Sequence, residues 1–503
     1  MSLFFKKKQV IKASNSNAQE SLSSLLTELA KSSDFNQSKA TNQQTKMDFS
    51  IGFFSTLVDN RILREDILPY LLEGDFSTLA DINQLVPKMQ CIITSDLTEM
   101  ERCLLEGCVL IRFDDEEKKA ALITARAEIG RNITELEIEY TVDGPKTAFV
   151  ESIDQNLNLV RSRIPLKELV VEEHIIGTLT KTRIVIMYIE GMTNTEIVDT
   201  LTQRITGITF DQILDSSFIE ELISDNYHSP FPQLMNTENP AKVAASLCEG
   251  KVAVLVNGSP FALLGPTNIF SFFNSFEDYL NNWYLSSFIR LLRTVGVIFS
   301  VLATPIYVAI LTYHPEIIPK DLMATLISSR ENVPFPPIIE AFFLELAIEL
   351  LREAGARLPT KVGQTIGIVG GIVLGTAVVD AGLTSNVLLI FVSIGALAAF
   401  TTPVYKISNT IRLLRFPFLF VAHLWGLLGI NLCAYFVLTH LIRLTSLDRP
   451  YLEPIYPPRL SDLKDSIIRG PLIKQTMRPG FLHSQQPLRF QPKQKKKSKD
   501  IDE

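Results

Sequence analysis

The feature that most constrains the fold of this chain is an uncharged, apolar run from Thr294 to Tyr313. A helix over this run is long enough to cross about 30 Å of hydrocarbon. It opens a longer region, 286–445, that is dominated by Leu, Ile, Val, Phe, Ala and Gly, while most charged residues lie before and after it. A soluble protein has no need for such segregation. The sequence therefore predicts an integral membrane protein in which 286–445 form an all-α transmembrane bundle.

The residues on either side of the bundle are predicted to be soluble. Residues 1–46 are rich in Ser, Asn, Gln and Lys, and we expect a disordered polar arm apart from one short helix in LSSLLTELA. An N-terminal α/β domain is expected next, with subdomains at 47–145 and 146–285. Residues 446–503 are expected to form a polar C-terminal tail.

The α/β assignment depends on short local patterns. The runs CVLIRFDD, KAALITARAEI and TRIVIMYIEG predict strands, and TNTEIVDTLTQRITGI has helical periodicity with Thr193 or Asn194 as its N-cap. A strand at Val252–Val256 continues into Asn257-Gly258 and a second apolar run. Because Asn-Gly favours positive φ angles, this pair predicts a β-hairpin with a type I′ turn.

Further membrane spans are predicted at 364–383, at 387–404 and within 413–444. The last stretch is too long for one upright helix, so it must tilt or extend beyond the bilayer. The stretch 333–359 adds a fifth span if it crosses the membrane. If it lies at the interface, the number of spans is four.

Basic residues indicate the orientation of the first span. Arg290 and Arg293 precede it and place that end in the cytoplasm, together with the N-terminal domain. Five spans would also bring further basic residues to the cytoplasmic side: Arg352, Arg357, Lys361, Lys406, Arg412 and Arg415. The sequence leaves open whether there are four or five spans, and on which side the C-terminal tail lies.

The stretch 333–359 carries acids within an otherwise apolar sequence. On a helix, Glu345, Glu349 and Glu353 lie within an arc of about 80°, whereas Glu340 lies about 140° from Glu345. Ionisable groups at membrane depth usually face a bundle interior or a water-filled cavity and mark ion or substrate paths. The three acids are therefore a candidate ion path. The alternative is an interfacial helix whose acids lie in water, with Glu353 paired to Arg357.

The predicted span after these acids carries a glycine every fourth residue: Gly363, Gly367, Gly371 and Gly375. Overlapping GxxxG pairs let a second helix approach closely in a membrane. We therefore predict a helix-packing role for this ridge. A flexible gate is the alternative.

Nothing in the sequence predicts an enzyme. The five cysteines include no CxxC pair, the six histidines include no HExxH motif, and no GxSxG elbow is present. No catalytic, cofactor or metal site is predicted. The net charge of −7, without a basic patch interleaved with aromatic residues, indicates no nucleic-acid partner.

Several blocks in this order resemble the A subunit of the GerA-type nutrient germinant receptors of endospore-forming bacteria. They are DQILDSSFIEELI (211–223), HSPFPQ (228–233), EGKVAVLVNGSPFALLGPT (249–267), FEDYL (276–280), PFPPIIEAFFLELAIELLREAGARLP (334–359) and VGQTIGIVGGIVLGTAVVDAG (362–382). The resemblance extends over about 140–460.

The resemblance implies a subunit of the spore inner membrane that acts with a permease-like B subunit and a lipoprotein C subunit. It also implies that A subunits form a homo-oligomer, a nutrient-gated channel for monovalent cations. The alternative is a membrane signalling scaffold without a pore, which couples the B subunit to downstream germination proteins. The nutrient and the number of subunits are not predicted.

Overall fold

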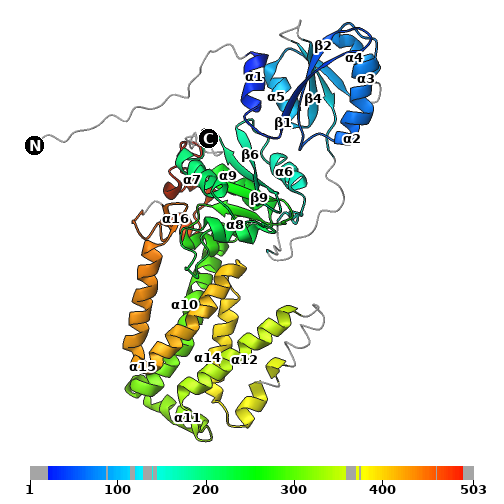
Figure 1. The fold of residues 1–503 in the computed structure, drawn as a ribbon. Helices are drawn as coiled ribbons and strands as arrows, with labels where there is room; N and C mark the ends of the chain where they lie inside the picture. Colours follow the sequence, from blue (N-terminus) through cyan, green and yellow to red (C-terminus); the bar gives the residue numbers. More distant parts are fainter. Residues whose placement is uncertain are drawn as a thin grey trace, which may run out of the picture. The chain divides into compact units, whose positions relative to one another are not determined.

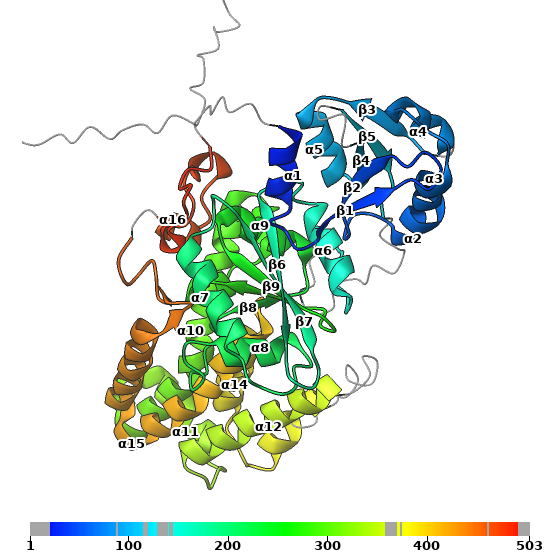
Figure 2. The same ribbon diagram turned by 45° about the horizontal axis from the view of Figure 1, so that its top comes forward.

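The computed structural model describes residues 21–86, 89–113, 119–127, 139, 144–357, 370–372, 375–459 and 462–490. The chain divides into two compact units. The first contains Met1–Asn132 and Asp154–Glu173, and the second contains Ile133–Ile153 and His174–Glu503. Figures 1 and 2 show the ribbon from two directions.

The first unit is built on a five-stranded sheet of order β1-β2-β4-β5-β3, in which every neighbouring pair is antiparallel. Its strands are β1 (Phe35–Thr41), β2 (Asp48–Phe54), β3 (Cys91–Thr94), β4 (Cys108–Phe113) and β5 (Ala120–Thr124). Its helices are α1 (Leu22–Leu29), α2 (Asn60–Ile62), the π-helical turn η1 (Leu63–Ile67), α3 (Leu68–Glu73), α4 (Leu79–Leu85), α5 (Leu97–Leu105) and α6 (Ile153–Arg161).

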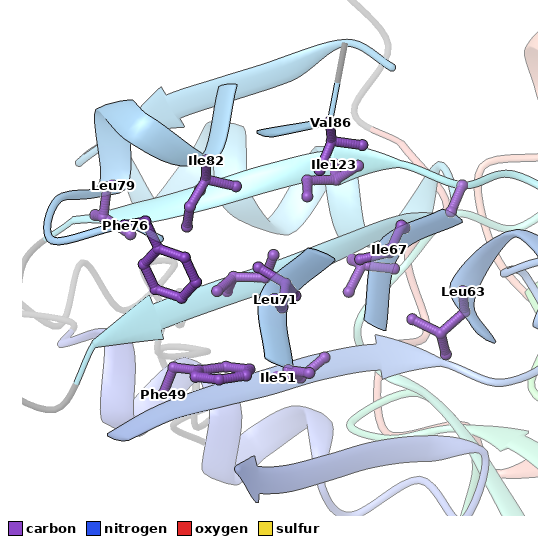
Figure 3. Close-up of a cluster of buried hydrophobic side chains, with 14 of the residues drawn as sticks. Phe49, Ile51, Leu63, Ile67, Leu71, Phe76, Leu79, Ile82, Val86 and Ile123 are labelled. Carbon is purple, nitrogen blue, oxygen red and sulfur yellow. The ribbon is translucent and has the colours of Figure 1, made fainter. Parts of the chain in front are cut away.

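Helices bury both faces of this sheet. Along β4, Val109 and Ile111 belong to the apolar cluster with η1, α3 and α4 that Figure 3 shows, whereas Cys108 and Leu110 belong to a second cluster with α1 and α5. Successive side chains of a strand point to opposite faces. Two buried faces therefore explain why CVLI, the first four residues of β4, is a continuous apolar run rather than an alternating one.

The short helix predicted in LSSLLTELA is confirmed as α1, which buries four leucines. The expectation that the remainder of 1–46 is disordered is wrong for the described residues after α1, because β1 pairs with β2 from Phe35↔Phe54 to Thr41↔Asp48. Strand β1 lies at the edge of the sheet, and most of its side chains are exposed and polar. Such a strand lacks the apolar alternation on which the sequence prediction depended.

A second five-stranded sheet has the order β6-β7-β9-β10-β8, and its strands β7 to β10 lie wholly in the second unit. The elements of this part are β6 (Leu169–Ile176), β7 (Thr182–Ile189), α7 (Thr195–Thr206), α8 (Ser216–Ile223), β8 (Met235–Thr237), α9 (Pro240–Glu249), β9 (Val252–Val256) and β10 (Ala262–Gly265). The predicted strand TRIVIMYIEG and the helix after it are confirmed as β7 and α7. The side chain of Asn194 caps α7 by accepting from the N–H of Glu196 at 3.0 Å.

Strands β9 and β10 form the predicted antiparallel hairpin, but the predicted type I′ turn is wrong. Leu255 pairs with Ala262, so the connection is longer than two residues. Gly258 has a φ of +88°, whereas Asn257 is not among the residues with positive φ. The N–H of Gly258 donates to the carbonyl oxygen of Glu151 at 2.9 Å. The backbone at Glu151 therefore fixes this loop. The Asn-Gly pair alone cannot predict such a contact, because the contact depends on a residue about 100 positions earlier in the chain.

The expectation of a polar tail over 446–503 is wrong for its described residues up to 490. They include β11 (Thr445–Ser446), β12 (Arg449–Pro450) and α16 (Leu463–Ser466). Leu447 joins the apolar core between the sheet and helices α7 and α8. The buried Tyr451 donates its hydroxyl to the carbonyl oxygen of Pro232 at 2.7 Å. Residues 491–503 lie outside the described part of the chain.

The membrane region contains α10 (Trp283–Tyr313), α11 (Lys320–Arg330), α12 (Pro337–Arg357), α14 (Asn386–Ala399) and α15 (Tyr405–Arg443). Helix α10 packs against α12, α14 and α15. Among the described residues, two helices, α10 and α15, are long and apolar enough to cross a membrane. The span predicted at 364–383 lies partly outside the described residues, so a count of four or five spans stays a prediction.

Helix α15 is two antiparallel legs rather than one rod (Figure 1). Its 39 residues would form a straight helix about 58 Å long. Instead, Gly426 has φ 60° and ψ −142°, which breaks the helix. A Cβ added to Gly429 would lie 2.8 Å from the side chain of Val421, so the two legs contact each other next to this break. We call residues 405–425 the first leg and residues 427–443 the second leg.

Candidate functional site

Helix α12 directs its first acids into the bundle. Glu345 and Leu344 are buried, whereas Phe343 and Leu350 are exposed in the single chain. The carboxylate of Glu345 therefore faces the neighbouring helices, as ionisable groups in a helix bundle usually do. Pro337 occupies the first helical position, where its missing N–H costs no hydrogen bond.

Glu345 lies at the centre of a buried polar cluster. Its carboxylate pairs with the guanidinium of Arg415 on the first leg of α15, and the two side chains are 3% and 5% exposed. The hydroxyl of Thr304 on α10 donates to Oε1 of Glu345 at 2.8 Å. Arg415 also donates to Oγ of Ser300 at 2.7 Å. Residues of α10, α12 and α15 therefore share one charge pair inside the bundle.

Glu349 lies one turn further along α12 and is also paired with arginine. Its Oε1 accepts from Arg352 of the same helix and lies 3.4 Å from a guanidinium nitrogen of Arg412 on the first leg. Arg412 is buried, whereas the side chain of Glu349 is 36% exposed. The carboxylate of this pair is therefore more exposed to solvent than that of the pair of Glu345 and Arg415.

The other two acids of α12 have separate environments. Glu353 pairs with Arg357 at 2.6 Å, and both side chains are largely exposed. This is the interfacial arrangement that the sequence left open. Glu340 is buried, and it accepts from Arg330 at 2.7 Å and from the backbone N–H of Ser385 at 3.2 Å. The assignment of Glu345, Glu349 and Glu353 to an ion path stays a prediction.

Arg412 and Arg415 are the residues that the sequence analysis did not connect to this site. Their place before the last predicted span indicated cytoplasmic charges, but α15 begins at Tyr405, so both lie inside the helix and are buried. Their spacing could have indicated the pairing. Arg412 and Arg415 are three residues apart and Glu345 and Glu349 are four apart, so each pair lies on one side of its helix and the two sides can face each other.

The glycine ridge is described only in part. Gly363 and Gly367 lie outside the described residues. A Cβ added to Gly371 would have no atom within 4 Å, and one added to Gly375 would lie 3.8 Å from the side chain of Leu389 on α14. The packing role of the ridge stays a prediction. Within the described part of the chain, no group of three or more His, Cys, Asp or Glu side chains could hold a metal ion.

The first turns of α10 are anchored to the C-terminal segment. Arg290 donates to the carbonyl oxygen of Asp465 at 2.6 Å and to the carboxylate of Asp278 at 3.1 Å. The hydroxyl of Tyr279 donates to Asp465 at 3.0 Å. Burial raises the pKa of Asp465, while the charge of Arg290 opposes that rise. The C-terminal segment therefore lies at the end of α10 that adjoins the sheet of the second unit.

Both ends of α15 contact this same α/β part. At its start, the ammonium of Lys406 pairs with Glu220 on α8. At its end, Nε2 of His440 lies 2.8 Å from Oγ of Ser229. Burial raises the pKa of Glu220, and the charge of Lys406 lowers it in turn. Helix α15 therefore leaves the α/β part and returns to it.

Comparison with known proteins gives a consistent result. The family described as Bacillus/Clostridium GerA spore germination protein matches residues 23–481. Spore germination protein GerQA of Bacillus cereus is 48% identical over 483 residues, 96% of this chain and 96% of that protein. Spore germination protein A1 of Bacillus subtilis (strain 168) is 40% identical over 420 residues, 84% of this chain and 87% of that protein. A crystal structure of the N-terminal domain of the A subunit of the Bacillus megaterium spore germinant receptor GerK3 aligns with a TM-score of 0.38 and 26% identity, and covers 49% of this chain and 92% of that chain.

Proposed function

Since this chain belongs to the Bacillus/Clostridium GerA spore germination protein family, we propose that it is the A subunit of a nutrient germinant receptor. In this proposal it is not an enzyme. It acts with a permease-like B subunit and a lipoprotein C subunit, and several A subunits assemble in the spore inner membrane around a path for monovalent cations. The acids on α12 line or border that path.

The observation that carries the proposal is a carboxylate inside the membrane bundle. Glu345 is 3% exposed, and it is held by Arg415, Thr304 and α12 itself. Moving a carboxylate out of water costs several kcal/mol unless it is paired. Ionisable groups at that depth usually mark ion or substrate paths, and cation paths use carboxylates there.

The contacts of the membrane helices support an even number of crossings. The start of α10 and the end of α15 both adjoin the α/β part of the second unit, where the C-terminal segment also packs. A folded segment cannot contact one domain from the other side of a bilayer. The proposed topology therefore has the N-terminal domain and the C-terminal segment together in the cytoplasm, with a multi-pass bundle between them.

Cysteine labelling tests this topology. A cysteine in place of Ile327, which is 64% exposed on α11 at the distal end of the bundle, should react with an impermeant maleimide from outside. One in place of Ile473, which is 75% exposed on the C-terminal segment, should react only after permeabilisation. Labelling of both positions from the same side would contradict the even count.

Potassium release tests the ion path. Spores with Glu345→Gln/Glu349→Gln should release K⁺ more slowly than wild-type spores after addition of yeast extract, because the path has lost two carboxylates. Immunoblots must show a normal amount of the variant. Wild-type release at a normal amount would refute the placement of the path at these acids.

A signalling scaffold without a pore is the second candidate. The observation in its favour is that Glu345 and Glu349 are already neutralised by arginines within the single chain. In that case the bundle would transmit a signal between subunits without conducting. A receptor that assembles with the B and C subunits and yet conducts no ions would favour the scaffold.

A further inference from the structure

We propose that the first leg of α15 is a latch, and that Arg415 is the positioning residue that holds Glu345 out of the ion path in this conformation. This inference rests on the proposed function, because it describes how the acids of α12 are controlled. The first leg carries three cations, and each is paired with an acid of another element: Lys406 with Glu220, Arg412 with Glu349, and Arg415 with Glu345.

The spacing of these pairs matches two helix faces. Arg412 and Arg415 lie three residues apart on the first leg, and Glu345 and Glu349 lie four residues apart on α12. Residues at these spacings share one side of a helix. The two helices therefore meet along a row of opposite charges, and a shift of one helix along the other would break both pairs together.

The burial of Glu345 indicates which state the structure represents. Its carboxylate is 3% exposed and accepts from both Arg415 and Thr304. A carboxylate paired with a guanidinium contributes no net negative charge to a neighbouring lumen. A cation is attracted to this site only after Arg415 has moved away, so the paired arrangement is the closed one.

The first leg also connects these acids to the α/β part. Lys406 pairs with Glu220 on α8, and the hydroxyl of Thr410 donates to the carbonyl oxygen of Pro230 at 2.5 Å. Both contacts lie within three turns of Arg415 on the same helix. A displacement of α8 or of the loop at Pro230 would therefore change the position of Arg415 relative to Glu345.

Two sets of substitutions test the latch without altering an acid of α12. Arg415→Lys keeps the positive charge but removes the forked guanidinium that joins Glu345 to Ser300. Glu220→Gln/Lys406→Met releases the other end of the leg and removes both charges, so no unpaired charge is left buried. The matched control is Glu65→Gln/Arg61→Met, which neutralises an exposed ion pair of the first unit.

The measurements are K⁺ release from spores in nutrient-free buffer and its dependence on yeast extract. We expect both test variants to raise the nutrient-free rate, or to lower the half-maximal concentration of yeast extract, by about fivefold. The maximal rate of Glu220→Gln/Lys406→Met should stay at the wild-type level, and the control should match wild type in every measurement.

The outcomes separate the latch from the ion path. Unchanged nutrient-free rates and unchanged half-maximal concentrations in both test variants, at normal protein amounts, would overturn the latch. If Arg415→Lys lowers the protein amount, Glu220→Gln/Lys406→Met alone decides. A failure of the ion path would appear separately, as an unchanged maximal rate in the Glu345→Gln/Glu349→Gln spores.

Discussion

Replacement of Gly426 by alanine tests whether α15 reverses direction in the membrane. Gly426 has φ 60° and ψ −142°, a region that is open essentially to glycine alone. A side chain in such a region costs of order 1–3 kcal/mol. A Cβ there would also lie 3.1 Å from the side chain of Tyr313 and 3.2 Å from Nε2 of His314, so these groups would have to move.

We therefore expect Gly426→Ala to destabilise the bundle by at least about 2 kcal/mol, which is roughly a thirtyfold change in an equilibrium constant. The assay is the fraction of detergent-solubilised protein that remains soluble after heating, read by immunoblot. Gly426→Ala should lose solubility at a lower temperature than wild type and should reach a lower amount in the membrane.

Gly355→Ala is the matched control. Gly355 lies inside helix α12, and a Cβ there has no atom within 4 Å, so alanine should be neutral or stabilise the helix by roughly 0.5–1 kcal/mol. If both variants behave alike, α15 does not reverse at Gly426. The two legs and the even number of crossings would then be wrong together.

Two further predictions concern the soluble part. Asp34→Ala removes the carboxylate that accepts from two nitrogens of the buried Arg161 at 2.6 Å, and should destabilise the first unit by about 3–5 kcal/mol, whereas Glu65→Ala at an exposed pair should cost less than about 1 kcal/mol. Hydrogen exchange of the α1 and β1 peptides measures both, and equal effects would contradict the buried network. Burial raises the pKa of Cys108 to about 11, so a maleimide at pH 7 should modify the exposed Cys248 and spare Cys108. Equal modification of the two thiols in peptide mass spectra would count against that burial.

Local patterns predicted the elements whose own residues carry a dense or regular apolar pattern. Strand β9 has the predicted bounds Val252–Val256, and β7 and α7 follow TRIVIMYIEG and its Asn194 cap. These elements carry dense β-branched residues or a regular apolar stripe, so the periodicity alone is sufficient.

The elements that the sequence did not predict depend on partners far along the chain. Strand β1 is polar because it lies at a sheet edge, and Leu447 is buried only because the C-terminal segment returns to α7 and α8. Neither fact is visible in a local window. The reversal of α15 was missed because one glycine in an apolar helix has no distinct periodicity.

The sequence singled out the acids of the candidate site but not the arginines that pair with them. The acids on α12 stand out because charges are rare in an apolar stretch. Their partners did not, because Arg412 and Arg415 lie near a predicted helix end, where basic residues ordinarily mark the cytoplasmic side. Only the position of Tyr405 as the start of α15 shows that both arginines belong to the bundle.

Conductance of the reconstituted receptor tests the central claim most directly. The chain would be purified with its B and C subunits, inserted into planar bilayers in KCl, and recorded before and after addition of yeast extract. The account predicts cation-selective currents that appear on addition and are reduced in Glu345→Gln/Glu349→Gln. The account would be contradicted if the assembled complex conducted no ions in the bilayer under any condition, although the same receptor supports normal germination in spores.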